Sequence, residues 1–252
     1  KMLDSIFSQK YGNFEIILVD DCSTDDYSIA LKKYSLDKRI KIIKNKKNSG
    51  PLFSRMEGIK HISGDYVIFL DADDTIDQNL LLSLNNVLSH KDYDLIVWNF
   101  SNESFSAENN CDFNISIRKL FLKNFNCSTL CTKCYKRNIV FYKRYPEEFY
   151  NQKYGDDTIM VYEFETTCKS IYFMNKGYYY YSPKNQKALF NSYVLSYNFN
   201  SDFEKYINSL IYSAFQNNFN IIHDFNRKRI YYILFVAKEI CYNKDNSRNL
   251  PY

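Results

Sequence analysis

The sequence predicts an α/β fold in which an open, mostly parallel sheet is flanked by helices. Strand-like apolar runs alternate four times with helix-like segments over about a hundred residues, which is typical of a parallel sheet with right-handed crossovers. Two of the apolar runs end in carboxylates, LVDD at Asp20 and Asp21 and FLDADD at residues 69–74. Such sheets bind ligands outside the carboxyl ends of their strands, so both acidic groups fall at the edge where a ligand is expected.

Each element of the first part has a local signal. Apolar residues at helical spacing predict a helix within residues 1–10, and the continuous apolar run of residues 14–21 predicts a strand covered on both faces. Ser23, Thr24 and Asp25 are helix-capping residue types and predict a helix within residues 22–35. Further strands are predicted over residues 39–45, 65–74 and 94–100, and further helices within residues 48–64 and 77–90.

The composition changes after residue 100. From Ser101 onward the chain turns polar and loses its periodicity, which predicts a loop or a domain boundary. Beyond this loop we expect a helical segment over residues 117–137, a tyrosine-rich strand ending near Tyr181, and several helices from about residue 193. The chain is therefore expected to have three parts, over residues 1–100, residues 101–190 and a C-terminal helical extension over residues 191–252.

Composition and charge exclude several classes of protein. The chain has 252 residues, a formal net charge of +4 and seven cysteines, and the small charge argues against nucleic-acid binding. No secretory signal is visible, and the apolar run at residues 230–237 is far shorter than the roughly 20 residues of a membrane helix. The odd number of cysteines fits a reducing compartment. We expect a cytoplasmic protein whose basic residues 227–232 permit a peripheral contact with the inner face of the cell membrane.

The stretch VIFLDADDTI places Asp71, Asp73 and Asp74 directly after a buried strand. Like charges this close repel one another, and their pKa values rise unless a cation or strong donors compensate. A divalent cation with an all-oxygen shell, completed by phosphate, resolves the repulsion and suits Mg²⁺ or Mn²⁺. The alternative is that some of these acids are solvated loop residues or helix caps.

One family with such a motif is the haloacid-dehalogenase-like phosphatases. Their first motif is DxDxT after an apolar strand, which Asp71, Asp73 and Thr75 resemble, and their last motif resembles the GDD of residues 155–157. However, two strands precede the motif here, Asp74 replaces the usual Gly, and no buried strand precedes the GDD. A phosphatase that is phosphorylated on Asp71 therefore remains an alternative hypothesis.

A second family matches far more of the chain. The motifs FEIILVDDCSTD, NSGPLFSRMEGIKHISGDYVIFLDADD, KCYKRNIV, YGDDTIM and KGYYYYSP resemble, in order and spacing, those of family 2 glycosyltransferases of the GT-A fold. The resemblance runs from Lys1 to about Lys184 and points to bacterial members that build capsules, lipopolysaccharide and other surface glycans. It implies inverting transfer of a sugar from a nucleotide-sugar, expected to be a UDP-sugar, to a glycan or lipid-linked acceptor. Residues 1–100 would bind the donor, and residues 101–190 would form the acceptor side.

The resemblance assigns roles on the donor side. Asp21 matches the Asp that hydrogen-bonds the nucleotide base, and Arg55 matches an Arg that faces the diphosphate. Asp71 and Asp73 match the DxD element, which grips the ribose and, through a divalent ion, the diphosphate. Asp73 and Asp74 are the expected metal ligands.

The resemblance also points to a catalytic base, because Asp157 aligns with the Asp of the family's acidic pair and Asp156 with its Glu. An acceptor hydroxyl must lose its proton as it attacks the anomeric carbon, and a carboxylate within hydrogen-bond reach can take it. The metal would offset the charge that grows on the departing nucleoside diphosphate. The simpler interpretation is that both acids begin a helix, where they interact well with the helix dipole, and both interpretations can hold together.

The chain also departs from the family. Family members begin with an extra strand, whereas this sequence begins in the helix that follows that strand. A sheet without the strand would expose two apolar edges. Either this sequence omits N-terminal residues, or another segment fills the gap, or the chain is a degenerate, non-catalytic transferase domain, which is a further alternative.

Cys127, Cys131 and Cys134 have the CxxxCxxC spacing of the cysteines that hold an iron–sulfur cluster in radical S-adenosylmethionine enzymes. The same spacing describes one face of a helix, and cysteine is a small residue that packs well in a core. We therefore predict core packing rather than a cluster.

Overall fold

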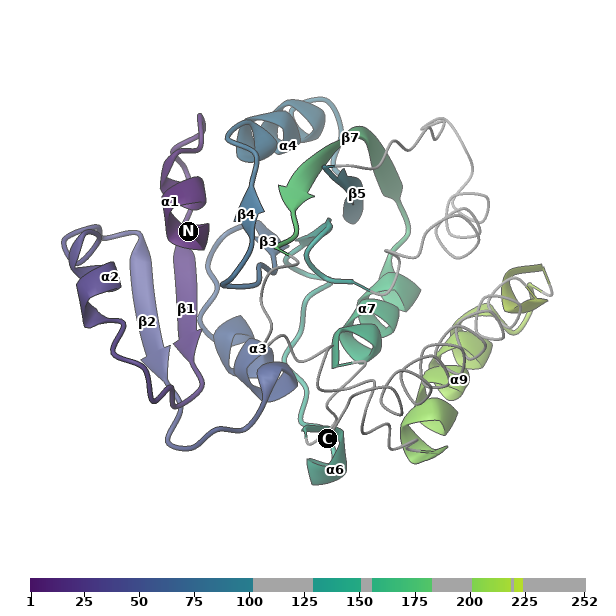
Figure 1. Cartoon of the computed structure of the whole chain (residues 1–252). Coiled ribbons are helices and arrows are strands. Elements are labelled where there is room, and N and C mark those ends of the chain that lie inside the picture. Colours follow the sequence, from purple (N-terminus) through teal and green to yellow (C-terminus); the bar gives the residue numbers. More distant parts are fainter. Residues whose placement is uncertain (102–128, 151–155, 183–200, 219, 224–252) are drawn as a thin grey trace, which may run out of the picture.

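The computed structural model describes residues 1–101, 129–150, 156–182, 201–218 and 220–223, and it has a mixed α/β fold (Figure 1). The strands are β1 (Ile16–Asp20), β2 (Ile40–Lys44), β3 (Tyr66–Ile68), β4 (Thr75–Ile76), β5 (Leu95–Phe100), β6 (Lys133–Lys136) and β7 (Ile171–Tyr180). The helices are α1 (Met2–Phe7), α2 (Ser28–Lys32), α3 (Pro51–Ile59), α4 (Leu80–Leu88), α6 (Glu147–Tyr150), α7 (Asp156–Thr167) and α9 (Ser201–Phe215).

The strands form two sheets. β1 and β2 pair in parallel, whereas a second, five-stranded sheet has the order β3-β6-β5-β7-β4. In the second sheet β5 and β7 are parallel, and the other neighbours are antiparallel. The predicted α/β class is confirmed, but the strand pairing is more mixed than the predicted mostly parallel sheet. The mixture arises because β6, which the sequence did not predict, enters the sheet between β3 and β5 and runs antiparallel to both, and because β4 runs antiparallel to β7.

The two sheets are separated by a slot. Among the described residues, β1 pairs only with β2 and β3 pairs only with β6, so each has one edge without a strand partner. A cavity of about 1810 Å³ lies between these edges and is lined by residues of β1, β3, α1 and α3. Within the described residues, no strand lies between these two edges.

The described part of the cysteine-bearing segment does not form a helix. Residues 117–128 of the predicted helix, including Cys127, lie outside the described residues, and residues 133–136 form β6 instead. Successive β6 side chains alternate between the two faces of the sheet, and Cys134 packs in a different core cluster from Tyr135. Cys131 and Cys134 are buried, which agrees with core packing, and no group of three metal-ligating side chains occurs in the described part of the chain.

Two hydrophobic clusters cover the faces of the five-stranded sheet. Leu95 and Val97 of β5 pack with α3, α7 and α9 on one face. Ile96 and Trp98, one residue out of step, pack with α1 and α4 on the other face. β5 is therefore buried on both sides, which explains its continuous apolar sequence.

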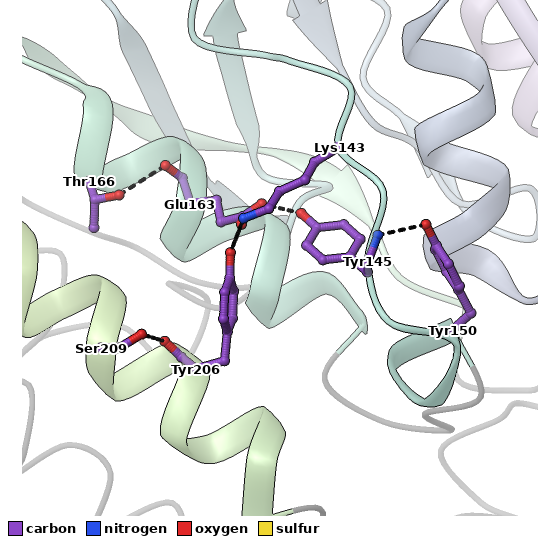
Figure 2. A network of polar contacts seen from close by, with 7 residues as sticks. All are labelled: Lys143, Tyr145, Tyr150, Glu163, Thr166, Tyr206 and Ser209. Atoms are coloured by element: carbon purple, nitrogen blue, oxygen red, sulfur yellow. Dashed lines mark hydrogen bonds and ion pairs between the residues drawn. The ribbon is translucent and has the colours of Figure 1, made fainter.

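Helix α9 is joined to the core by a polar network on α7. The buried carboxylate of Glu163 accepts hydrogen bonds from Tyr206 of α9, from Tyr145 and from Lys143, whose Nζ is 2.7 Å away (Figure 2). Ile207 and Ile211 of α9 pack in the same core cluster as α7. The helical extension predicted over residues 191–252 is thus described only in part, and the three-part division stays a prediction. Within the described residues, no helix combines the length and apolar character needed to cross a membrane.

Candidate functional site

The acidic loop after β3 holds its three aspartates in different environments. Asp71 is 42% exposed and Asp73 is exposed, whereas Asp74 is only 2% exposed. Asp74 Oδ2 accepts a hydrogen bond from the Tyr179 hydroxyl at 2.5 Å, and Asp74 Oδ1 accepts one from the Ser182 amide at 2.8 Å. Burial raises the pKa of Asp74, and these two donors oppose the rise. Asp74 therefore fastens the loop to the end of β7, and Asp71 and Asp73 remain accessible.

Arg55 brings the acidic loop together with the acids of α7. Its Nη2 lies 3.1 Å from Asp71 Oδ1, and its Nη1 lies 2.6 Å from Asp157 Oδ1. The same Nη1 donates a hydrogen bond to Asp156 Oδ2. The Arg55 side chain is only 18% exposed, so a largely buried cation links three carboxylates from two distant segments of the chain.

Asp157 is a buried carboxylate with a raised pKa. Burial is the main cause that raises its pKa, to about 7, and the neighbouring Asp156 raises it further, whereas Arg55 lowers it. Asp157 Oδ2 also accepts a hydrogen bond from the Leu130 amide at 3.2 Å. A carboxylate with a pKa near the operating pH is well suited to accept a proton from a hydroxyl. Asp157 also lies in the first turn of α7, as the helix-dipole interpretation predicts.

The two aspartates that end β1 each hold a loop. Asp20 is buried, and Tyr27 and Ser23 donate to its carboxylate at 2.5 and 2.8 Å. The hydrogen bond from Tyr27 is the main cause that lowers the pKa of Asp20 to about 2. Asp21 accepts hydrogen bonds from the Gly50 amide at 2.7 Å and from the Ser49 amide at 3.0 Å. Asp20 therefore orients the loop that follows β1, and Asp21 orients the loop ahead of α3.

Gly50 is the residue at which this loop becomes α3. It has a φ of 88°, a region that L-residues with a side chain seldom adopt. A Cβ at this position would lie 2.8 Å from the Tyr150 carbonyl oxygen. Pro51 then begins the helix, where its missing N–H costs nothing. Asp21 thus contacts the residue that precedes α3, and α3 carries Arg55. All three residues, Asp21, Gly50 and Arg55, line the cavity beside β1.

The structure gathers most of the residues that the sequence singled out. Arg55, Asp71, Asp156 and Asp157 form one ion-pair network, while Asp21 lies beside it at the start of α3. Sequence reasoning missed the contacts of Tyr179 and Leu130. The tyrosine-rich stretch predicted only a strand, and the Leu130 contact comes from a backbone amide, which leaves no signal in the sequence.

The accessible carboxylates are suited to a hard divalent cation. Asp71 and Asp73 offer only oxygen ligands, and the described residues contain no complete protein cage for a metal. Mg²⁺ and chemically similar ions commonly bind through one or two carboxylates and complete their shell with water and phosphate oxygens. The site therefore fits a metal that binds together with a phosphate-bearing ligand.

Comparisons with known proteins indicate the family of this chain. A family model described as "Glycosyl transferase family 2" matches residues 1–164. "Glycosyltransferase GlyG" of Streptococcus pneumoniae is 24% identical over 77% of this chain and 69% of its own length. "Putative teichuronic acid biosynthesis glycosyltransferase TuaG" of Bacillus subtilis is 39% identical over 28% of each chain.

The fold is also found among solved structures. The S. aureus TarS 1–349 structure "in complex with UDP-GlcNAc" has a TM-score of 0.70 and 21% identity, covering 92% of this chain and 68% of that chain. This likeness supports the GT-A fold, and the family match decides against the phosphatase interpretation. Because the family model spans well over half of the sequence, this chain belongs to glycosyltransferase family 2.

Proposed function

We propose that the protein is a metal-dependent inverting glycosyltransferase of bacterial surface polysaccharide synthesis. It moves a sugar from a nucleoside-diphosphate donor, expected to be a UDP-sugar, to a glycan or lipid-linked acceptor. The observation that carries the proposal is the Arg55 network, in which an acid on the donor side, Asp71, and a candidate base, Asp157, contact the same guanidinium. An inverting displacement needs this pair of functions, a charged donor site and a base facing it.

Asp157 is the group that moves a proton. Its Oδ1 contacts Arg55 and its Oδ2 contacts the Leu130 amide, so the carboxylate is held on both sides. With a pKa of about 7, it is about half deprotonated at neutral pH, and the deprotonated form can accept the acceptor's hydroxyl proton as the bond to the anomeric carbon forms. Asp156, which accepts a hydrogen bond from the same Nη1 that Asp157 contacts, keeps the guanidinium in place.

The donor would be held by the N-terminal loops. Asp21 is proposed to face the nucleotide base, and the Ser49 and Gly50 amides that it orients shape the same loop. Asp71 and Asp73 would grip the ribose and the diphosphate, and Asp73 would hold Mn²⁺ or Mg²⁺. Asp74 would add a metal ligand where Tyr179 or Ser182 releases its hydrogen bond to one of the Asp74 carboxylate oxygens. When bound, the metal neutralises charge on the leaving nucleoside diphosphate. Arg55 supplies a further positive charge on that side.

The likeness to TuaG and the motif pattern support a bacterial surface-glycan acceptor. We accordingly propose that the protein works in the cytoplasm, at the inner face of the cell membrane. Fractionation of cells that express a tagged full chain checks this location, and recovery of the protein outside the membrane and cytoplasmic fractions contradicts it.

A screen of nucleoside diphosphates tests the function directly. Ligands that bind the folded state raise the melting temperature, so UDP with Mn²⁺ should stabilise the protein more than UDP alone or the other diphosphates. Asp73→Ala should lose the Mn²⁺-dependent part of the shift, and Asp26→Ala, an exposed acid outside the site, serves as the control. If no diphosphate binds with or without metal, the chain is a non-catalytic transferase domain and the proposal is wrong.

A further inference from the structure

A buried ion pair lies directly behind the candidate base. Lys133, the first residue of β6, and Glu165 of α7 are both 0% exposed, and Lys133 Nζ lies 3.9 Å from Glu165 Oε1. Burying two charges costs several kcal/mol per ion, and their attraction often fails to repay this cost. Neither carboxylate oxygen of Glu165 has a hydrogen-bond partner in the described part of the protein. The pair is therefore expected to contribute little to the stability of the folded state.

The hydrogen bonds of Lys133 show which part of the backbone it contacts. Lys133 Nζ donates a hydrogen bond to the Thr129 carbonyl at 2.6 Å, and the Lys133 amide donates to the Leu130 carbonyl at 3.1 Å. The Thr129 hydroxyl also contacts that of Thr132 at 3.1 Å. Lys133 thus closes the turn of residues 129–132 onto the start of β6.

The same turn contacts the candidate base. The Leu130 amide, which belongs to the peptide group whose carbonyl accepts from Lys133 Nζ, donates to Asp157 Oδ2 at 3.2 Å. One planar peptide group therefore connects Lys133 on one side with Asp157 on the other. Asp157 Oδ1 forms the ion pair with Arg55, and the Leu130 amide fixes Oδ2 by a hydrogen bond.

We infer that Lys133 is a positioning residue for Asp157: it fixes the Thr129–Leu130 peptide, and the Leu130 amide of that peptide orients the carboxylate. Glu165 is its buried counter-ion. Burial lowers the pKa of Lys133 and the charge of Glu165 opposes this, while burial raises the pKa of Glu165 to about 8 and the charge of Lys133 opposes that rise. This inference rests on the proposed role of Asp157 as the base, but the connection between Lys133 and Leu130 can be measured without any substrate.

The test replaces the ion pair with apolar side chains of similar length. In a Lys133→Met, Glu165→Met double variant no charge is left unpaired, so the fold should be at least as stable as the wild type in urea. Lys136→Met is the matched control, because Lys136 lies on the same strand but pairs with the exposed Asp92. A double variant that is clearly less stable would show that the pair serves stability, and the inference would be wrong.

Amide exchange and kinetics then read out positioning. We expect hydrogen exchange at Leu130 to become at least about tenfold faster in the double variant and to stay unchanged in the control. For consumption of the nucleotide-sugar whose diphosphate stabilises the protein best, kcat should fall about tenfold or more while KM stays within about twofold. Wild-type exchange at Leu130 together with wild-type kcat would overturn the inference. If Asp157→Asn keeps full turnover while Leu130 exchange still responds to Lys133, only the role of Asp157 as the base has failed.

Discussion

The two-stranded sheet and the five-stranded sheet hold their acidic side chains in opposite ways. β2 is partly open to solvent, with Ile42 49% exposed, whereas residues 95–99 of β5 are all buried. At the end of β1, hydrogen bonds lower the pKa of Asp20 to about 2, so the charged form is favoured. In α7, which packs on one face of the five-stranded sheet, burial raises the pKa of Asp157 to about 7. In the first region, acids order loops through hydrogen bonds. In the second region, burial makes the charged form of an acid unfavourable, and an acid with such a raised pKa suits the proposed proton transfer.

The largest effect is expected for Asp157→Asn. Loss of the base should lower sugar transfer by a factor on the order of 10² to 10⁴ without weakening nucleotide binding.

The raised pKa of Asp157, about 7 in the folded protein against 3.8 ordinarily, makes the folded state less stable as pH rises between these values. The variant should therefore gain stability relative to the wild type at pH 8 but not at pH 4, as measured by thermal unfolding. An unchanged pH dependence would contradict the raised pKa.

The same substitution in each sheet tests the difference in burial. Ile96→Ala, in a fully buried position of β5, should lower the free energy of unfolding by about 2–5 kcal/mol. Ile42→Ala, on the half-exposed β2, should cost about 1 kcal/mol or less. Urea denaturation measures both values. Equal losses would show that the two-stranded sheet belongs to the same cooperative core.

A third substitution tests the backbone of the donor loop. Gly50→Ala would place a Cβ 2.8 Å from the Tyr150 carbonyl oxygen in a conformation with φ of 88°. The strain should cost about 1–3 kcal/mol and displace the Ser49 and Gly50 amides from Asp21. Calorimetry with UDP and Mn²⁺ should therefore find weaker binding as well. Gly12→Ala, where a Cβ meets nothing within 4 Å, is the control and should leave both quantities unchanged.

The smallest effect is expected for Tyr27→Phe, which removes the main donor to Asp20. The lowered pKa of Asp20 stabilises the fold above its ordinary value of 3.8, and this contribution is lost as pH falls through about 2. The variant should be about 1–2 kcal/mol less stable than the wild type at pH 6. The difference should shrink toward pH 2, which is the opposite slope to that of Asp157→Asn. Equal differences at both pH values would contradict the role of the Tyr27 hydrogen bond.

Sequence reasoning succeeded where a local pattern controls the structure. β1, β2, β3 and β5 lie within their predicted ranges, because buried strands need continuous or alternating apolar residues. β6 was missed because its charged Lys133 and its cysteines at helical spacing imitate a helix, and only pairing with β3 and β5 makes it a strand.

The candidate site was predictable as a set of residues but not as an arrangement. Motif order identified Arg55, Asp71 and Asp157, yet Arg55 and Asp156 are 101 residues apart in the chain. The buried carboxylate of Asp74 accepts a hydrogen bond from a tyrosine that lies 105 residues away in the chain. Such long-range contacts depend on how the elements pack, and a single sequence carries no direct record of them.

The slot between β1 and β3 has a consequence for the protein in solution. Within the described residues, each of these edges leaves backbone amides and carbonyls with which an extended segment, from this chain or from another molecule, can pair. Asp21 and Arg55 line the same cavity, so a chain that entered the slot would crowd the loops that are proposed to hold the nucleotide. Self-association and donor binding should therefore compete. Affinity for UDP, measured over a range of protein concentrations, should fall as the protein becomes more concentrated.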